Sequence, residues 1–156
     1  MADIVSKTKR SKMMAGITSK DTRPELVVRK SLWHEGIRYR LHRKNMPGRP
    51  DLVLPKHKAV IFIHGCFWHQ HDCHLFKWPS TRPDFWKTKL ERNVIRDCKV
   101  QDELLNQGWR CLIIWECSLK GKNKLPRDEM VKRVIEWLHS DNNKMTIRGR
   151  NAELSK

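Results

Sequence analysis

Apolar and polar residues recur along the chain with periods that predict both helices and strands. Thr22 and Glu25 form a capping-box pattern at the start of one helix, Gly108 follows the end of another, and Pro126 opens a third. Short alternating or apolar runs between them predict strands. The predicted elements are a helix over 22–36, strands over 37–43, 51–54 and 59–64, a helix over 83–107, a strand over 110–117 and a helix over 126–139.

This order predicts an α/β fold around a mixed sheet of four strands, followed by a C-terminal helix. Three strands form a meander, and the long helix crosses over to a fourth strand parallel to the third. Because parallel neighbours end at the same edge of a sheet, we expect the residues after His64 and after Glu116 to lie close together. In the hairpin, Asp51 faces the end of the next strand, over 62–64. Residues 65–83 have no period and predict a long functional loop.

The length of 156 residues predicts one globular domain. We expect this domain over 22–140, preceded by a basic arm over 1–21 and followed by a loose polar tail over 141–156. The chain has 33 Lys and Arg against 17 Asp and Glu, a net charge of +16 that is spread along its length. Such an excess indicates an anionic partner, with nucleic acid ahead of anionic lipid.

Two classes of protein are excluded by the same sequence. The apolar runs are too short to span a bilayer, which excludes a membrane protein. The first ten residues have no apolar leader, so we expect no secretion. Five cysteines in a chain without a leader then indicate reduced thiols or metal ligands rather than a disulfide framework.

Histidine and cysteine supply six of the eleven residues from His64 to His74. Cys66, His71 and Cys73 give three ligands of the kind that Zn²⁺ prefers, and Cys117 ends the strand predicted to lie beside them. The sequence therefore predicts a closed structural zinc site of these four residues. Buried thiols with solvated imidazoles are the plain alternative. A catalytic zinc would need an open position and a nearby glutamate, and neither a His-x-Glu nor a His-Glu-x-x-His motif occurs.

Asp51, at the start of a strand, is a candidate ligand for Mg²⁺, which needs few protein ligands. Glu25, His64 and His69 could orient the metal's waters or move protons. By itself Asp51 is more typical of a turn or strand cap than of a metal ligand. Aromatic residues in and after the loop suggest wedges that unstack bases, although core packing is the ordinary alternative for rings on a helix. The candidate wedges are Phe67, Trp68, Trp86 and, on the basic arm, Met14.

Several motifs together resemble the very short patch repair (Vsr) DNA mismatch endonucleases. They are Arg10-Ser-Lys12, Pro47-Gly-Arg-Pro-Asp51, Val60-Ile-Phe-Ile-His-Gly-Cys-Phe-Trp-His69 with His71 and Cys73, and Trp115-Glu-Cys117. The resemblance covers residues 1–140 in order. It implies a restriction-endonuclease-like αβββαβ core with a structural zinc. It also implies Mg²⁺-dependent nicking of one strand next to the T of a T:G mismatch, the lesion left when 5-methylcytosine deaminates.

The resemblance further assigns roles to residues. Asp51 would bind Mg²⁺ together with the backbone carbonyl of Ile63, Glu25 and His64 would support the metal's waters, and His69 would be the main acid or base. The products would carry 5′-phosphate and 3′-hydroxyl ends. The zinc ligands would be Cys66, His71, Cys73 and Cys117; Phe67, Trp68 and Trp86 would enter the duplex from one groove and Met14 from the other.

The setting implied is a monomer in a bacterial cytoplasm, working at the nucleoid beside mismatch-repair proteins. The acidic-x-Lys pattern of the wider endonuclease superfamily is replaced by Phe62-Ile-His64, which leaves the number of metals and the proton carrier open. Asp97, on the long helix, could orient a histidine. Two rival functions remain at this point: a non-catalytic, zinc-stabilised DNA-binding module, and a protein that binds or cleaves RNA.

Overall fold

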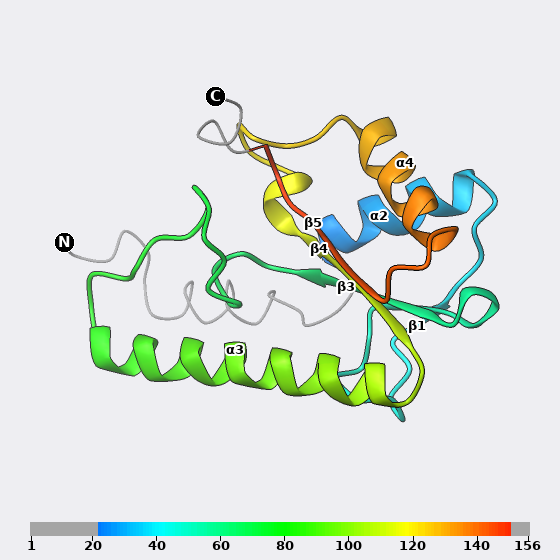
Figure 1. The fold of residues 1–156 in the computed structure, drawn as a ribbon. Helices are drawn as coiled ribbons and strands as arrows, with labels where there is room; N and C mark the ends of the chain where they lie inside the picture. The colour runs from blue at the N-terminus through cyan, green and yellow to red at the C-terminus, as the bar shows by residue number, and fades with distance from the viewer. Residues whose placement is uncertain (1–21, 151–156) are drawn as a thin grey trace, which may run out of the picture.

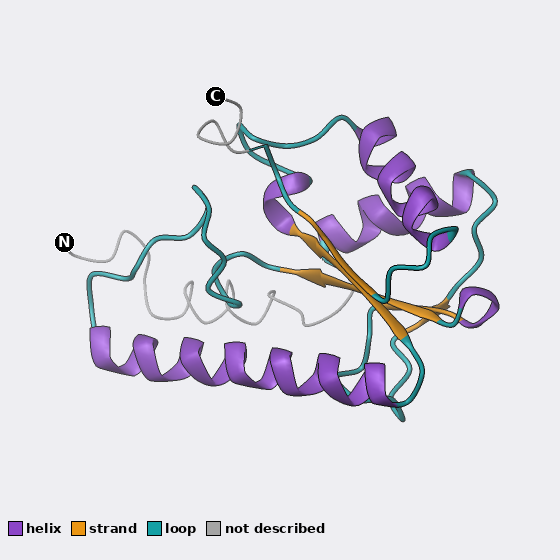
Figure 2. Cartoon of the chain, in the orientation of Figure 1, coloured by secondary structure: helices purple, strands orange, loops and turns teal. Residues whose placement is uncertain are grey.

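A computed structural model describes residues 22–150. Figure 1 shows the ribbon and Figure 2 the same view coloured by secondary structure. The helices are α2 (Arg23–His34), α3 (Pro83–Asn106) and α4 (Arg127–Leu138), with short 3₁₀ turns at Pro55–His57 and Glu116–Ser118. The strands are β1 (Arg40–Leu41), β2 (Leu52–Leu54), β3 (Ala59–His64), β4 (Arg110–Trp115) and β5 (Lys144–Ile147). Within residues 22–150, no helix is both long and apolar enough to cross a membrane.

The strands form one mixed sheet in the order β1-β2-β3-β4-β5. β1 pairs antiparallel with β2, and β2 pairs antiparallel with β3, which confirms the predicted meander. β3 and β4 are parallel, with His64 opposite Trp115, so the segments that follow them begin side by side as predicted. The hairpin between β2 and β3 turns through Lys58, whose left-handed backbone (φ 52°) closes the 3₁₀ turn.

The sheet separates two hydrophobic cores because successive strand residues point to opposite faces. On β3, Ala59 and Ile61 face the larger core, which α2 and α4 cover, whereas Val60 and Phe62 face a smaller core closed by Leu104 of α3. Figure 2 shows α2 and α4 on one side of the sheet and α3 on the other. The N-terminal half of α3 extends past the sheet beneath the loop that follows β3, where it can contribute side chains to a site (Figure 1).

The prediction of four strands is wrong, because the sheet has five. The prediction that the tail after Ser140 is loose is also wrong over the residues of β5, because this strand pairs in parallel with β4. Only Ile147 of this strand is fully buried, so its own pattern is too weak to indicate a strand. The strand is stabilised from outside, by the open edge of β4 and by the core into which Ile147 packs.

Candidate active site and metal cluster

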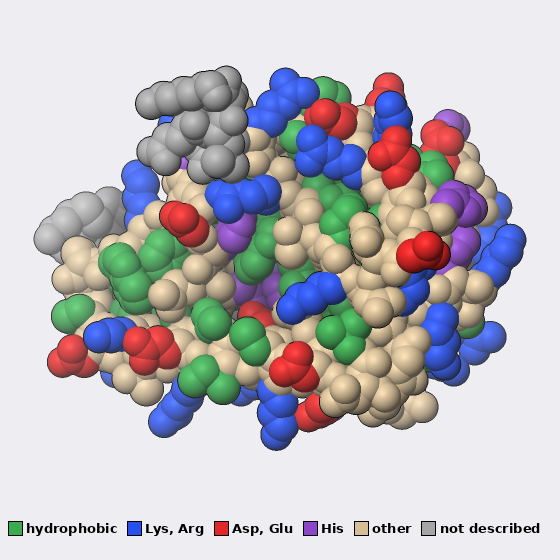
Figure 3. Space-filling view, viewed as in Figure 1, with side chains coloured by type: hydrophobic (Ala, Val, Ile, Leu, Met, Phe, Trp, Pro, Cys, Tyr) green, Lys and Arg blue, Asp and Glu red, His purple; other side chains and the backbone are tan. Residues whose placement is uncertain are grey.

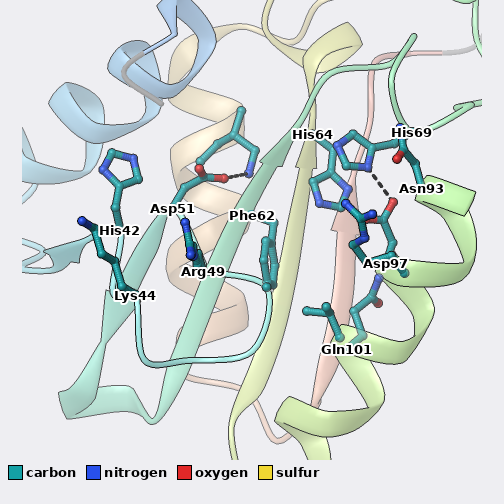
Figure 4. Close-up of a pocket in the computed structure, with 14 residues that line it drawn as sticks. His42, Lys44, Arg49, Asp51, Phe62, His64, His69, Asn93, Asp97 and Gln101 are labelled. Carbon is teal, nitrogen blue, oxygen red and sulfur yellow. Dashed lines mark hydrogen bonds and ion pairs between the residues drawn. The ribbon is translucent and has the colours of Figure 1, made fainter. Parts of the chain in front are cut away.

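A cavity of about 640 Å³ lies between the ends of β2 and β3 and the side of α3. Acidic and histidine side chains occupy its floor, and basic side chains from the loop before β2 and from α3 line its walls (Figure 4). The space-filling view shows histidine side chains in a hollow above α3, with Lys and Arg around it (Figure 3). The acidic and histidine residues of the lining include Asp51, His64, His69 and Asp97, and the basic ones include Lys44, Arg49 and Arg96.

Asp51 lies immediately before β2, and its carboxylate is fixed to the end of β3. Its Oδ2 accepts a hydrogen bond of 2.7 Å from the backbone N–H of Ile63. Burial raises the pKa of the Asp51 carboxyl from 3.8 to about 7, and the charge of Glu25 acts in the same direction, while the Ile63 N–H and His42 oppose the rise. A buried carboxylate short of positive charge is a site that a cation would stabilise.

Glu25 and His42 meet Asp51 on the side of the cavity that faces α2. Glu25 is 2% exposed, and its Oε2 lies 3.2 Å from Nη1 of Arg29 and 2.9 Å from Nε2 of His42. One ligand atom of each of Glu25, His42 and Asp51 falls within 4.8 Å of the others. The two carboxylates were predicted to act together, but His42 was missed. Its signal was the pairing of the first two strands, because Leu41 opposite Leu52 brings the next residue beside Asp51.

His64, His69 and Asp97 form a second polar cluster in the same cavity. Nδ1 of His69 lies 2.5 Å from Oδ2 of Asp97. The imidazole rings of His64 and His69 stack with their centroids 3.7 Å apart (Figure 4). Burial first, then the charges of His69 and His71, hold the pKa of His64 well below its usual value, so His64 is neutral at pH 7. The structure therefore brings together Asp51, His64 and His69, and it places Asp97 beside His69, the kind of contact that the sequence suggested for Asp97.

Cys66, His71, Cys73 and Cys117 form the cluster predicted for zinc, with ligand atoms within 4.8 Å of one another. Backbone N–H groups donate to two of the sulfurs: Cys117 to Cys66 and Gly149 to Cys117, both at 3.3 Å. The hydrogen bond with the Cys66 thiol lowers the pKa of Cys117; burial opposes this effect, and His71 and the Gly149 N–H add to it. Clustered sulfurs and an imidazole are a donor set that fits a structural zinc ion.

The aromatic residues of the loop gather beside the cavity. The ring centroids of Phe67, Trp68 and Trp86 lie 5.2 to 5.9 Å apart, so the three predicted wedges form one cluster. Trp68 is 36% exposed, and its carbonyl accepts a hydrogen bond from Asn93 of α3, which ties the loop to the helix. Met14 and the basic arm lie outside the described residues.

Carboxylates and imidazoles that converge in a basic cavity are the side chains with which proteins hydrolyse phosphate esters, so fold and site define an α/β protein equipped as a hydrolase. The family model "DNA mismatch endonuclease Vsr" matches residues 2–75. The DNA mismatch endonuclease Vsr of Escherichia coli strain K12 is 44% identical over 138 residues, which cover 88% of each chain. The chain therefore belongs to the Vsr family of DNA mismatch endonucleases.

Two further relatives are named as nicking enzymes. The type II nicking enzyme V.NmeAIP of Neisseria meningitidis serogroup A is 47% identical over 122 residues, 78% of this chain and 87% of the relative. The type II nicking enzyme V.XorIIP of Xanthomonas oryzae pv. oryzae is 44% identical over 125 residues, 80% of this chain and 92% of the relative.

Proposed function

We propose that this protein nicks one strand of double-stranded DNA beside the T of a T:G mismatch, and so begins very short patch repair. The observation that carries the proposal is the position of Asp51, whose carboxylate is fixed to β3 in the cavity that also holds His69 and Asp97. Family membership supports the same activity, because relatives are named as mismatch endonuclease and nicking enzymes. A restriction-endonuclease-like core, a monomeric state and 5′-phosphate products belong to the proposal.

Two metal ions complete the proposal. Asp51, with the backbone carbonyl of Ile63, would hold Mg²⁺, and Glu25 and His64 would support its waters; because burial raises the pKa of Asp51, a bound cation would stabilise its ionised form. When bound, such an ion polarises the scissile phosphate and lowers the pKa of a bound water. The Cys66, His71, Cys73 and Cys117 cluster would hold a structural Zn²⁺, which fixes the loop after β3 to the sheet.

His69 is the proposed carrier of the proton. Its Nδ1 is engaged by Asp97, so Nε2 is the nitrogen left to exchange a proton in the cavity. Asp97 holds one tautomer and stabilises the imidazolium that forms, the part that a carboxylate commonly plays beside a catalytic histidine. His64 is neutral and stacks on His69, which fixes the plane of the ring without adding a positive charge.

Basic side chains would bind the DNA backbone, and aromatic side chains would distort the duplex. Lys44, Arg49 and Arg96 line the cavity, where they would contact phosphates on either side of the scissile bond. The cluster of Phe67, Trp68 and Trp86 would enter the duplex, which a mismatch makes cheaper to open. Met14 on the arm would enter from the other groove. The substrate implies a bacterial cytoplasm, at the nucleoid, with mismatch-repair proteins as partners.

The proposal is tested by nicking of labelled duplexes that carry T:G, T:A or C:G at one position, with Mg²⁺ present. The wild type should nick only the T-containing strand of the T:G duplex. Asp51→Asn should abolish nicking, and His69→Gln should lower its rate by about 10²- to 10⁴-fold. Asp102→Asn is the matched control, because Asp102 is exposed on α3 and should leave the rate unchanged.

Other outcomes of these assays would indicate a different function. A wild type that binds the T:G duplex without cutting it is a non-catalytic DNA-binding module, and equal nicking by wild type and Asp51→Asn removes the assigned site. Cleavage of an RNA duplex in preference to the T:G duplex would indicate an RNA-directed enzyme, because the deep groove of A-form RNA does not admit wedges in the same way.

A further inference from the structure

His42 adopts a backbone conformation that non-glycine residues rarely take. Its φ is 44°, in the left-handed region, directly after the two-residue strand β1. Such strain persists only where the surrounding structure enforces it, and it is common at functional sites. Here the backbone N–H of His42 donates to the carbonyl of Asp51 at 3.3 Å. This bond ties His42 to the residue that carries the proposed metal-binding carboxylate.

The imidazole of His42 lies beside two carboxylates, but its Nε2 forms a hydrogen bond with neither of them. Its Nε2 is buried and makes no hydrogen bond with any atom of residues 22–150. That nitrogen nevertheless lies 2.9 Å from Oε2 of Glu25, so the contact has the right length but not the alignment of a hydrogen bond. Figure 4 shows the ring next to Asp51, on the side of the cavity toward α2.

The spacing matches the edge of a coordination octahedron. Two ligand atoms at right angles, each about 2.1 Å from one ion, lie about 3.0 Å apart. The 2.9 Å between His42 Nε2 and Glu25 Oε2 agrees with that edge. A ligand atom of Asp51 lies within 4.8 Å of both, a separation that places all three within reach of one ion.

We propose that Nε2 of His42, together with Glu25, binds directly to the divalent ion held by Asp51. This inference rests on the proposed function, which supplies the ion, and it makes Glu25 a direct ligand rather than only a support for the metal's waters. Two carboxylates balance the charge of the ion, and a neutral imidazole adds a donor without adding charge. Imidazole suits Mn²⁺ and later transition metals better than Mg²⁺, which prefers oxygen. The site therefore binds Mn²⁺ more tightly than an all-oxygen site would.

The alternative is that His42 only pairs with Glu25 as a protonated imidazole. An ion pair needs a nitrogen-bound proton directed at the carboxylate, and the orientation of Nε2 does not provide this. If His42 only paired with Glu25, a metal ion bound at this site would show no magnetic coupling to a nitrogen nucleus of His42. The two roles are therefore separated by spectroscopy on the metal itself rather than by activity.

The test uses the full chain with its cysteine cluster loaded with zinc, which is silent in electron paramagnetic resonance. Mn²⁺ is added, and pulsed measurements record whether a ¹⁴N nucleus is coupled to it. The wild type should show directly bound nitrogen, and His42→Gln should lose that coupling. We expect His42→Gln to weaken Mn²⁺ binding about 10-fold or more and Mg²⁺ binding less than about threefold.

His69→Gln is the matched control, because His69 belongs to the other histidine cluster that could capture Mn²⁺. The nitrogen coupling should survive in His69→Gln. If it survives in His42→Gln and disappears in His69→Gln, the ion lies in the other cluster and the proposal is overturned. Growth of the wild type on ¹⁵N-histidine should convert the ¹⁴N coupling to ¹⁵N, a measurement that does not depend on a variant folding.

Failure of this inference differs from failure of the proposed function. Nicking of T:G duplexes with bound Mn²⁺ that shows no nitrogen coupling refutes the ligand role of His42 but keeps the enzyme. A wild type that neither nicks nor binds Mn²⁺ refutes the enzyme, and with it the ion on which the role of His42 depends.

Discussion

Replacement of Asp51 by asparagine should stabilise the protein while it removes activity. Asp51 is buried next to Glu25, and burial is the main reason that its pKa rises from 3.8 to about 7. The folded protein therefore favours the protonated carboxyl, and without a metal it must hold an unfavourable negative charge above pH 7. Asparagine keeps the size of the side chain and an oxygen that can accept the N–H of Ile63, but it never ionises.

The sign and size of the effect follow from the two pKa values. Between pH 3.8 and about 7, the unfolded chain has released the proton of Asp51 and the folded chain still holds it, so wild-type stability falls as pH rises. The loss is about 1.4 kcal/mol per pH unit in this window, or about 4 kcal/mol in full. The advantage of Asp51→Asn should therefore grow by about 2 to 3 kcal/mol from pH 5 to pH 8.

The assay is urea denaturation of both proteins at pH 5, 6, 7 and 8, with zinc retained and magnesium absent. Contributions of titrating groups that do not interact with Asp51 are common to both and cancel in the difference. Asp102→Asn should differ from the wild type by the same amount at every pH, because Asp102 is exposed. Added Mg²⁺ should stabilise the wild type alone and narrow the gap. A difference between wild type and Asp51→Asn that does not vary with pH would refute the reasoning.

Cys117→Ser should lose bound zinc, measured by elemental analysis, and lower the melting temperature, whereas Cys98→Ser should retain both because Cys98 is exposed on α3. Arg110→Ala should lower the free energy of unfolding by about 2 to 4 kcal/mol in urea denaturation, since its guanidinium donates to carbonyls at the end of α4 and in the turn before β5; an unchanged value would contradict this. Trp68→Ala should weaken binding to a T:G duplex by about 1 to 3 kcal/mol in a fluorescence anisotropy titration. Trp33→Ala, on α2 and 51% exposed, should not.

The helices and the first four strands could be predicted because each carries a local signal. The capping box before α2, the run of β-branched residues in β3 and the apolar stripe of α4 act through neighbours in the sequence. β5 carries no such signal, and Ile147 becomes a core residue only because β4 offers an open edge. A strand stabilised by its partner cannot be read from its own residues.

For the site, the sequence by itself determined the donor chemistry: a dense set of histidines and cysteines in one loop, with Cys117 placed beside them by the parallel pairing of two strands. It also placed Asp51 opposite the end of β3, because a hairpin fixes register. Only the tertiary structure decided that α3 brings Asp97 to His69 and that a strained turn brings His42 to Glu25. Those contacts join segments 28 and 17 positions apart, and their distances depend on how a helix packs on the sheet and how a loop turns. Neither of these is encoded by the pattern of any single segment.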